Sequence, residues 1–210
     1  MERKHDIIDY RATLMVDKNN VARDWNGHTF LRKDHLVKPA TWKKPRLVFV
    51  CSMGDLFHEG HLFEWINAVF SVMADHDQHT FIVLTKRPQR MLDFIGWKEA
   101  QHGIPWQPKD NIWMGVTAEN QEQANKRIPV LLGIPAAIRF VSIEPMLGPV
   151  DLNHLNVGIS LEENALTGKA YSLGETYMDG PKLDWVICGG ESGHKARPIH
   201  PDWVRSVRDQ

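Results

Sequence analysis

Five apolar segments of this sequence are each followed by side chains that could bind a ligand. Hydroxyls, carboxylates, two adjacent cations and a glycine pair come at or just after the segment ends: Ser52, Asp55, Lys86, Arg87, Glu119, Ser142, Glu144, Gly189, Gly190, Glu191 and Ser192. Carboxylates can bind an ammonium group or ribose hydroxyls, and cations can bind a carboxylate or phosphate. The glycines would let the backbone approach a ligand closely. If the segments converge, these residues predict a pocket for a small zwitterionic or nucleotide ligand. Polar turns are also common wherever strands meet solvent, so the inference depends on the recurrence.

The segments that must position these side chains are short and almost continuously apolar. They span 47–51, 81–85, 112–116, 138–142 and 184–188, and they are rich in β-branched residues. Strands buried on both faces, as in parallel sheets, have this pattern. We therefore predict five parallel strands whose carboxyl ends carry the polar groups.

Helical patterns separate the predicted strands. Residues 61–76 place their apolar side chains at helical spacing, and Pro88 suits the start of a helix over 88–97. A third helix is predicted over 119–135, with an interruption near Pro129, and a fourth over 200–210. The intervening segment 158–182 is polar and glycine-rich, which predicts an excursion, either a flap or a small insert.

The alternation of strands and helices predicts an α/β fold. A (β/α) barrel and a doubly wound open sheet both fit the alternation. The chain lacks an early glycine-rich phosphate-binding turn, and its polar strand ends suit a common mouth. We therefore favour an incomplete (β/α) TIM-type barrel with parallel strands over residues 25–210, preceded by a variable N-terminal segment over 1–24.

The composition of the chain restricts the classes of partner that it is expected to bind. The chain has 210 residues and a formal net charge of −1, so no overall basic field favours nucleic acid. Aromatic residues beside cations, at Trp42-Lys43-Lys44 and Trp97-Lys98, keep nucleic acid as an alternative partner. No apolar run is long enough to cross a membrane, and the N-terminus lacks the apolar core of a signal peptide. We expect a cytoplasmic protein without membrane contact.

The cysteines and histidines do not predict a metal centre. Two cysteines, Cys51 and Cys188, cannot form a disulfide framework or a four-cysteine zinc site, and they are too few for the usual iron–sulfur ligand set. We expect both to be buried small side chains at strand ends, where they could lie near each other. His58 and His61 lie three residues apart rather than the four of a metalloprotease helix. They are predicted to belong to a polar cluster at a helix N-terminus.

Five long blocks, in this order, resemble a known family. The blocks are KPRLVFVCSMGDLFHE, HTFIVLTKRPQRM, NIWMGVTAEN, IRFVSIEPMLGPVDL and LDWVICGGESGHKARPIHPDWVRSVRDQ. They resemble the bacteriophage Gp37/Gp68 proteins, known as domain of unknown function 5131, over roughly residues 25–210. The resemblance therefore implies a phage or prophage protein of uncharacterised function. That family in turn looks like a radical S-adenosylmethionine (SAM) barrel.

The resemblance implies SAM as the ligand and assigns roles to the strand ends. Asp55 would bind the methionine ammonium, Glu119, Ser142 and Glu144 would contact the ribose or methionine, and the glycine turn at 189–192 would close the site. Family members normally carry three cysteines near the N-terminus that ligate a [4Fe–4S] cluster, and residues 1–24 contain none. A cluster is therefore not expected in this chain alone, and catalysis is left open.

Two alternatives to a SAM pocket follow. The chain could be a non-catalytic nucleotide or nucleic-acid binding module, or an inactive fragment of a split prophage gene. Both edges of the barrel look trimmed relative to the family, so we also expect that exposed barrel edges could support a homodimer.

Overall fold

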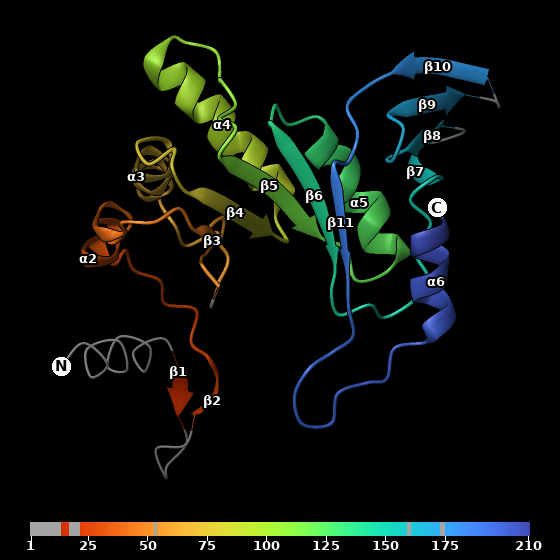
Figure 1. Cartoon of the computed structure of the whole chain (residues 1–210), viewed down its shortest axis with the longest axis horizontal. Coiled ribbons are helices and arrows are strands. Elements are labelled where there is room, and N and C mark those ends of the chain that lie inside the picture. The colour runs from red at the N-terminus through yellow and green to blue at the C-terminus, as the bar shows by residue number, and fades with distance from the viewer. Residues whose placement is uncertain (1–13, 17–21, 53, 159–160, 173–174) are drawn as a thin grey trace.

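The computed structural model describes residues 14–16, 22–52, 54–158, 161–172 and 175–210. Its centre is a five-stranded parallel sheet in the order β11-β6-β5-β4-β3 (Figure 1). The strands are β3 (Leu47–Val50), β4 (Thr80–Thr85), β5 (Ile112–Thr117), β6 (Ile138–Ile143) and β11 (Trp185–Cys188). They coincide with the five apolar runs, so the predicted parallel strands are confirmed.

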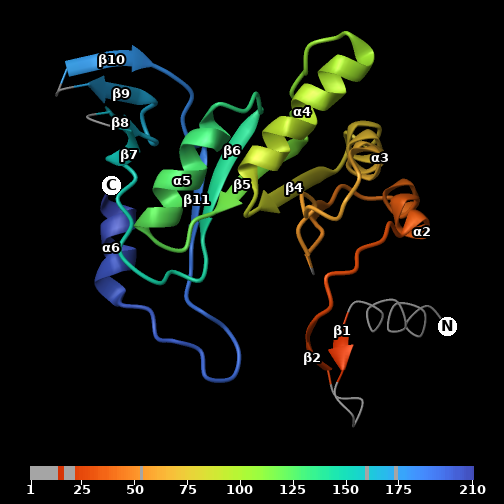
Figure 2. The ribbon, with the colours of Figure 1, turned by 180° about the vertical axis from the view of Figure 1, so that it is seen from behind.

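Along the chain, one helix follows each of β3, β4, β5 and β11. These helices are α3 (Phe63–Ala74), α4 (Pro88–His102), α5 (Gln121–Leu132) and α6 (Pro201–Asp209). Helix α3 packs beside α4, and α4 packs beside α5, on one face of the sheet (Figure 2). The strand order never reverses along the sheet, and right-handed crossovers then place successive helices on the same side. None of these described helices is long and apolar enough to cross a membrane.

Helix α5 differs from its prediction. The interruption expected near Pro129 is wrong, because α5 continues through this residue to Leu132. Proline removes one backbone donor from a helix but not its acceptor, and the Gly133 N–H still donates to the Pro129 carbonyl at 3.1 Å. The start of α5 is fixed by Asn120, whose side chain accepts the Gln123 N–H at 3.0 Å.

The sheet is open, and it does not close into a barrel. Within the described residues, β3 pairs only with β4 and β11 only with β6, so both have a free edge. On the β3 edge, Leu47 is 60% exposed and Phe49 is 48% exposed. The fold is therefore mixed α/β with a parallel sheet, as predicted, but a closed TIM barrel is not formed.

The two faces of the sheet bury different side chains, because successive residues of a strand point to opposite sides. Val83, Met114 and Val141 pack into the core beneath the helices. On the opposite face, Trp185 contacts Trp113, with ring centroids 5.7 Å apart, and also Phe140. This second face ends at Thr117 and Ser142, which are register partners on β5 and β6. The polar ends of the strands thus continue an apolar sheet face.

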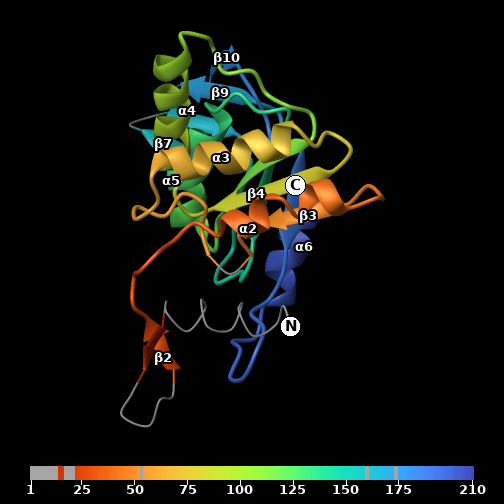
Figure 3. The same ribbon diagram turned by 90° about the vertical axis from the view of Figure 1, so that its left-hand side faces the viewer.

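The excursion between β6 and β11 is a second, antiparallel sheet. Its strands are β7 (Leu155–Gly158), β8 (Leu161–Asn164), β9 (Lys169–Ser172) and β10 (Glu175–Asp179), in the order β10-β9-β8-β7. Of the two predicted alternatives, a flap or a small insert, the segment is an insert with its own strand pairing. It lies on the far side of the parallel sheet from the hairpin of β1 (Leu14–Val16) and β2 (Ala22–Trp25) (Figure 3). The apolar spacing at Ile7, Ile8, Leu14 and Met15 predicts a short helix; Leu14 and Met15 instead lie in β1, and the other two positions lie outside the described residues.

Candidate functional site

Asp55 joins the loops that follow β3 and β4. Its Oδ1 atom accepts hydrogen bonds from the Phe57 N–H at 2.9 Å and from the Thr85 hydroxyl at 2.7 Å. Its Oδ2 atom accepts from the Lys86 N–H at 3.0 Å and from Arg87 Nη1 at 3.0 Å. An ionised carboxylate has about four acceptor positions, and the protein fills all of them. Asp55 therefore holds the two strand ends together and has no free acceptor for a ligand's ammonium group.

Arg87 is held between two carboxylates. Its Nη1 atom pairs with Asp55, and its Nε atom donates to Glu59 Oε1 at 2.8 Å. The hydrogen bond to Glu59, together with the one to Asp55, raises the pKa of Arg87 above its usual value. The same bond lowers the pKa of Glu59. The guanidinium charge is thus balanced inside the protein.

Glu119 accepts two cations at the end of β5. Lys86 Nζ pairs with Oε1, and Arg127 Nη1 donates to Oε2 at 2.9 Å and to the Thr117 carbonyl at 2.7 Å. Burial alone would raise the pKa of Glu119, but the hydrogen bond from Lys86 and the charges of Arg127 and Lys86 outweigh it, so the pKa is lowered. The Lys86 side chain is 53% exposed and that of Arg127 is 14% exposed. Lys86 can therefore leave Glu119 for a ligand while Arg127 keeps the carboxylate paired.

We expect Glu119 to contribute to stability at neutral pH. Because its folded pKa lies below the ordinary value of 4.5, its contribution is fully present above that value and is lost as pH falls through the folded pKa. The Glu119→Gln variant should lose less stability than the wild type between pH 6 and pH 3. Melting temperatures across this range would test it, with the exposed Glu122→Gln on α5 as the control. Parallel curves for the wild type and Glu119→Gln would contradict the expected role.

A cavity of about 740 Å³ opens at the carboxyl ends of β3 and β4. Four of the predicted residues line it, namely Ser52, Asp55, Lys86 and Arg87. Thr85 and Thr117 add hydroxyls, while Phe30, Phe49 and Leu84 add apolar surface. Residues 27–30 form the remaining wall, fastened where the Thr29 hydroxyl donates to the Gly60 carbonyl at 3.0 Å. The cavity has the size and mixed lining of a small-molecule site.

The predicted residues on β6 and β11 form a neighbouring cluster and do not line this cavity. The Ser142 hydroxyl donates to Glu144 Oε2 at 3.1 Å. A side chain at Gly189 would lie within 3.2 Å of three Glu144 atoms, so glycine is required there for the carboxylate to fit. Gly190 instead packs near Ile199. The two groups of residues are connected through the backbone, since the Ala118 N–H donates to the Ser142 carbonyl at 2.9 Å.

The end of the glycine turn faces solvent. Glu191 binds Arg197 through both carboxylate oxygens at 2.8 Å, and this hydrogen bonding lowers the pKa of Glu191 to about 2. Ser192, next to it, does not line the cavity either. The five strand ends therefore do not form one common cleft, because an open sheet spreads β11 away from β3.

Sequence reasoning missed the wall at residues 27–30 and placed His61 in a polar cluster at a helix N-terminus, without a role in binding. His28, His58 and His61 all line the cavity. The sequence pattern could have indicated part of the lining, because Phe49 and Leu84 lie on the same sheet face as Thr117, at alternating strand positions. The contact with residues 27–30 had no such signal, because it joins segments 31 residues apart through a single threonine.

The family model described as protein of unknown function, DUF5131, matches residues 5–210. The chain belongs to this family. No match was found among curated proteins or among solved structures.

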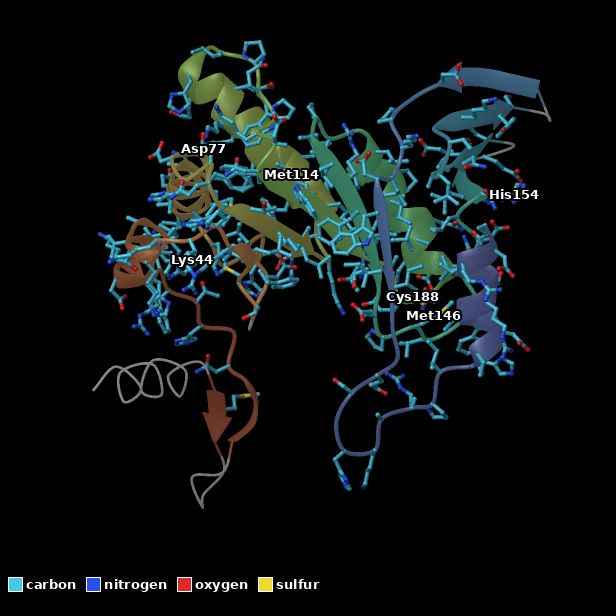
Figure 4. All side chains as sticks on the ribbon, viewed as in Figure 1. Lys44, Asp77, Met114, Met146, His154 and Cys188 are labelled. Carbon is cyan, nitrogen blue, oxygen red and sulfur yellow. The ribbon has the colours of Figure 1, made fainter. Side chains whose placement is uncertain are left out.

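The two cysteines of this DUF5131 protein lie on opposite edges of the sheet. Cys51 follows β3 and is exposed, with a left-handed φ of 54°, whereas Cys188 is half-buried at the end of β11, beside Met146 (Figure 4). Burial and the nearby charge of Glu144 raise the pKa of Cys188, which disfavours the thiolate that metals bind. The expectation that both are buried is wrong for Cys51, and three strands separate the two thiols. Among the described residues, no group of three or more histidines, cysteines or carboxylates could hold a metal ion.

Proposed function

We propose that this chain is a phage or prophage protein that binds SAM, or a similar zwitterionic or nucleotide molecule, at the strand ends of a radical-SAM-like partial barrel. The observation that carries the proposal is the 740 Å³ cavity at the ends of β3 and β4, lined by Lys86, Arg87 and aromatic side chains. The strand order and the placement of α3, α4 and α5 on one face are also those of a barrel segment rather than of a doubly wound sheet.

The lining of the cavity suits each part of such a ligand. Phe30 and Phe49 offer apolar surface to a flat base, and the Thr117 hydroxyl can bind a ribose. Lys86 is the cation free to move, because Arg127 remains on Glu119 when Lys86 leaves. A ligand carboxylate or phosphate would therefore bind at Lys86.

An iron–sulfur cluster does not fit the residues present. A [4Fe–4S] cluster is usually held by several thiolates on one site, and the two cysteines lie on opposite edges of the sheet. We therefore propose ligand binding without reductive cleavage of SAM by this chain alone.

The two tryptophan–lysine motifs give little support to the nucleic-acid alternative. Trp42 packs against His79 and lies under the Arg46 guanidinium, 4.9 Å from the ring centroid. Trp97 packs against Phe63 and Phe94. These rings are engaged with the protein, so they do not present the open stacking faces that single-stranded nucleic acid needs.

We expect isothermal titration calorimetry to detect SAM binding to the wild type. The Lys86→Ala variant should bind about tenfold more weakly, because one charge-assisted hydrogen bond is lost. Lys109→Ala is the matched control, since Lys109 is an exposed lysine at the amino end of β5 and should leave the affinity unchanged. Absence of SAM binding would overturn SAM as the ligand, and equal affinity in Lys86→Ala would overturn the role of Lys86 in the proposed site. Binding of an oligonucleotide that weakens steeply with salt would favour the nucleic-acid module instead.

A further inference from the structure

Two histidines on the loop between β3 and α3 line the cavity and are held in opposite tautomers. His58 Nδ1 accepts a hydrogen bond from the Gly60 N–H at 3.1 Å, whereas His61 Nδ1 lies 2.9 Å from the Leu56 carbonyl oxygen. A backbone N–H can only donate and a carbonyl can only accept. In the neutral rings, the proton of His58 is therefore on Nε2 and the proton of His61 is on Nδ1.

These tautomers give the cavity one donor and one acceptor. Within the described part of the chain, neither Nε2 atom hydrogen-bonds to the protein, so the Nε2–H of His58 and the Nε2 lone pair of His61 are available. The ring centroids lie 5.8 Å apart, close enough to contact neighbouring groups of one small molecule. Both rings are fixed by the same short loop, which begins at Asp55. The loop contains a turn in which the His58 N–H donates to the Asp55 carbonyl at 3.0 Å.

The loop geometry depends on Gly60. A Cβ atom at this position would lie 3.0 Å from the Thr29 hydroxyl and 3.3 Å from His58 Nδ1. Glycine therefore allows the cavity wall and the His58 ring to approach the same peptide unit. Arg90 holds the other end of the loop by donating to the His61 carbonyl.

Among the described residues, Asp55 is the carboxylate that lines the cavity, and it is already occupied. Asp55 has all four acceptor positions filled, and the Thr85 hydroxyl donates to Asp55 while accepting the Arg87 N–H at 2.9 Å. Glu59 and Glu119, the nearby carboxylates, are paired with Arg87 and with Lys86 and Arg127. A ligand ammonium therefore lacks a free carboxylate among the side chains that line the cavity, and the His61 lone pair is the nitrogen acceptor that can take its place.

We propose that the cavity recognises an amino-acid-type zwitterion, with its ammonium donating to His61 Nε2 and its carboxylate bound by Lys86 and the His58 Nε2–H. This inference rests on the ligand cavity proposed above and replaces Asp55 with His61 as the ammonium-binding residue. No proton is transferred, and His61 acts as a binding residue that sets specificity for the α-amino group.

The tautomers can be measured in the ligand-free protein. Two-bond ¹H–¹⁵N correlation spectra at pH 8, where histidines are mainly neutral, should show His58 protonated at Nε2 and His61 at Nδ1. Assignment would use the His58→Gln and His61→Asn variants. If His61 is found with its proton on Nε2, the inference is overturned, because that atom is then a donor.

Ligand titrations test the contact itself. L-Methionine, a bare zwitterion, should shift the His61 Nε2 signal of the wild type. His61→Asn should weaken its binding about tenfold. The asparagine keeps an N–H donor for the Leu56 carbonyl and removes only the distal acceptor. His76→Asn is the matched control, since His76 Nδ1 bonds the Val72 carbonyl at 2.7 Å in the same way but lies outside the cavity.

The outcomes separate this inference from the proposed function. If L-methionine shifts His61 Nε2 but SAM does not bind, zwitterion recognition stands and the SAM proposal falls. If SAM binds equally well to His61→Asn and leaves the His61 Nε2 signal unchanged, the cavity stands and the role of His61 is overturned. If neither molecule binds, both proposals are overturned.

Discussion

The Gly115→Ala variant should be about 3 kcal/mol less stable than the wild type, at the upper end of the usual cost of overpacking a core. Gly115 lies in β5, and its register partner on β6 is Phe140, which is fully buried. The added Cβ atom would lie within 2.6 Å of three atoms of the Phe140 ring. The ring cannot move away freely, because Trp185 packs against it. Urea unfolding followed by tryptophan fluorescence would measure the loss.

Gly96→Ala is the control for this prediction. Gly96 lies inside α4, and a Cβ atom there would meet nothing within 4 Å. Alanine favours a helix over glycine by about 1 kcal/mol, so this variant should be slightly more stable than the wild type. The same glycine-to-alanine change would then lower the stability in β5 and raise it in α4. If Gly115→Ala kept wild-type stability, the ring of Phe140 could not lie across Gly115.

The double variant Gly115→Ala/Phe140→Leu distinguishes a steric conflict from a general intolerance of β5. Leucine removes ring atoms that the new Cβ atom would meet, so the two substitutions should cost less together than the sum of their separate costs. Contacting residues typically show such coupling, whereas distant ones add. Additive costs would place the conflict elsewhere than at the Phe140 ring.

The sequence could predict the strands because their burial leaves a strong local pattern. Segments such as 81–85 and 138–142 are apolar at nearly every position, since one set of side chains packs under the helices and the other covers the opposite sheet face. Helix ends were also readable where they depend on one residue, as at Pro88. The extent of α4 beyond Trp97 was missed, although Gly103, in the left-handed region at φ 64°, is a residue type that commonly ends a helix.

Whether the sheet closes could not be predicted from the strands. Closure depends on contacts between β3 and β11, which lie at the two edges of the sheet and carry no local signal for pairing. The recurring polar strand ends favoured an incomplete barrel, and the common cleft followed from the expected convergence of those ends. The open sheet instead divides the predicted residues into a cavity group around Asp55 and a second group around Glu144.

The role of Asp55 shows the same limit at the scale of one side chain. Its position after a strand correctly placed it at the cavity, but its sequence context could not show that four internal donors occupy the carboxylate. Residue type and spacing indicate where a charge lies. Hydrogen-bond saturation depends on partners about 30 residues away, and it decides whether the charge is available to a ligand.

Asp55→Ala should accordingly destabilise the protein by about 3 kcal/mol, since hydrogen bonds to charged groups contribute about 1.5–3 kcal/mol and an unpaired partner adds a desolvation cost. The Asp55 side chain is 15% exposed and its partner Arg87 is 30% exposed, so solvent replaces the lost bonds only in part. Without the carboxylate, the Thr85 hydroxyl and the Lys86 N–H lose their acceptor, and the loops after β3 and β4 are no longer joined. Urea unfolding would measure the loss.

Glu59→Gln is the matched control, because it removes the other carboxylate that binds the same arginine. The Glu59 side chain is 68% exposed, and exposed ion pairs contribute about 0–1 kcal/mol, so this variant should remain close to wild-type stability. A loss in Glu59→Gln as large as that in Asp55→Ala would mean that the pairing of Arg87, rather than the joining of two strand ends, governs the site. A small loss in both would show that the cavity is held by its other wall, where Thr29 binds Gly60. The expected difference between the two variants therefore tests whether Asp55 acts through its four internal donors, and it does so without any ligand.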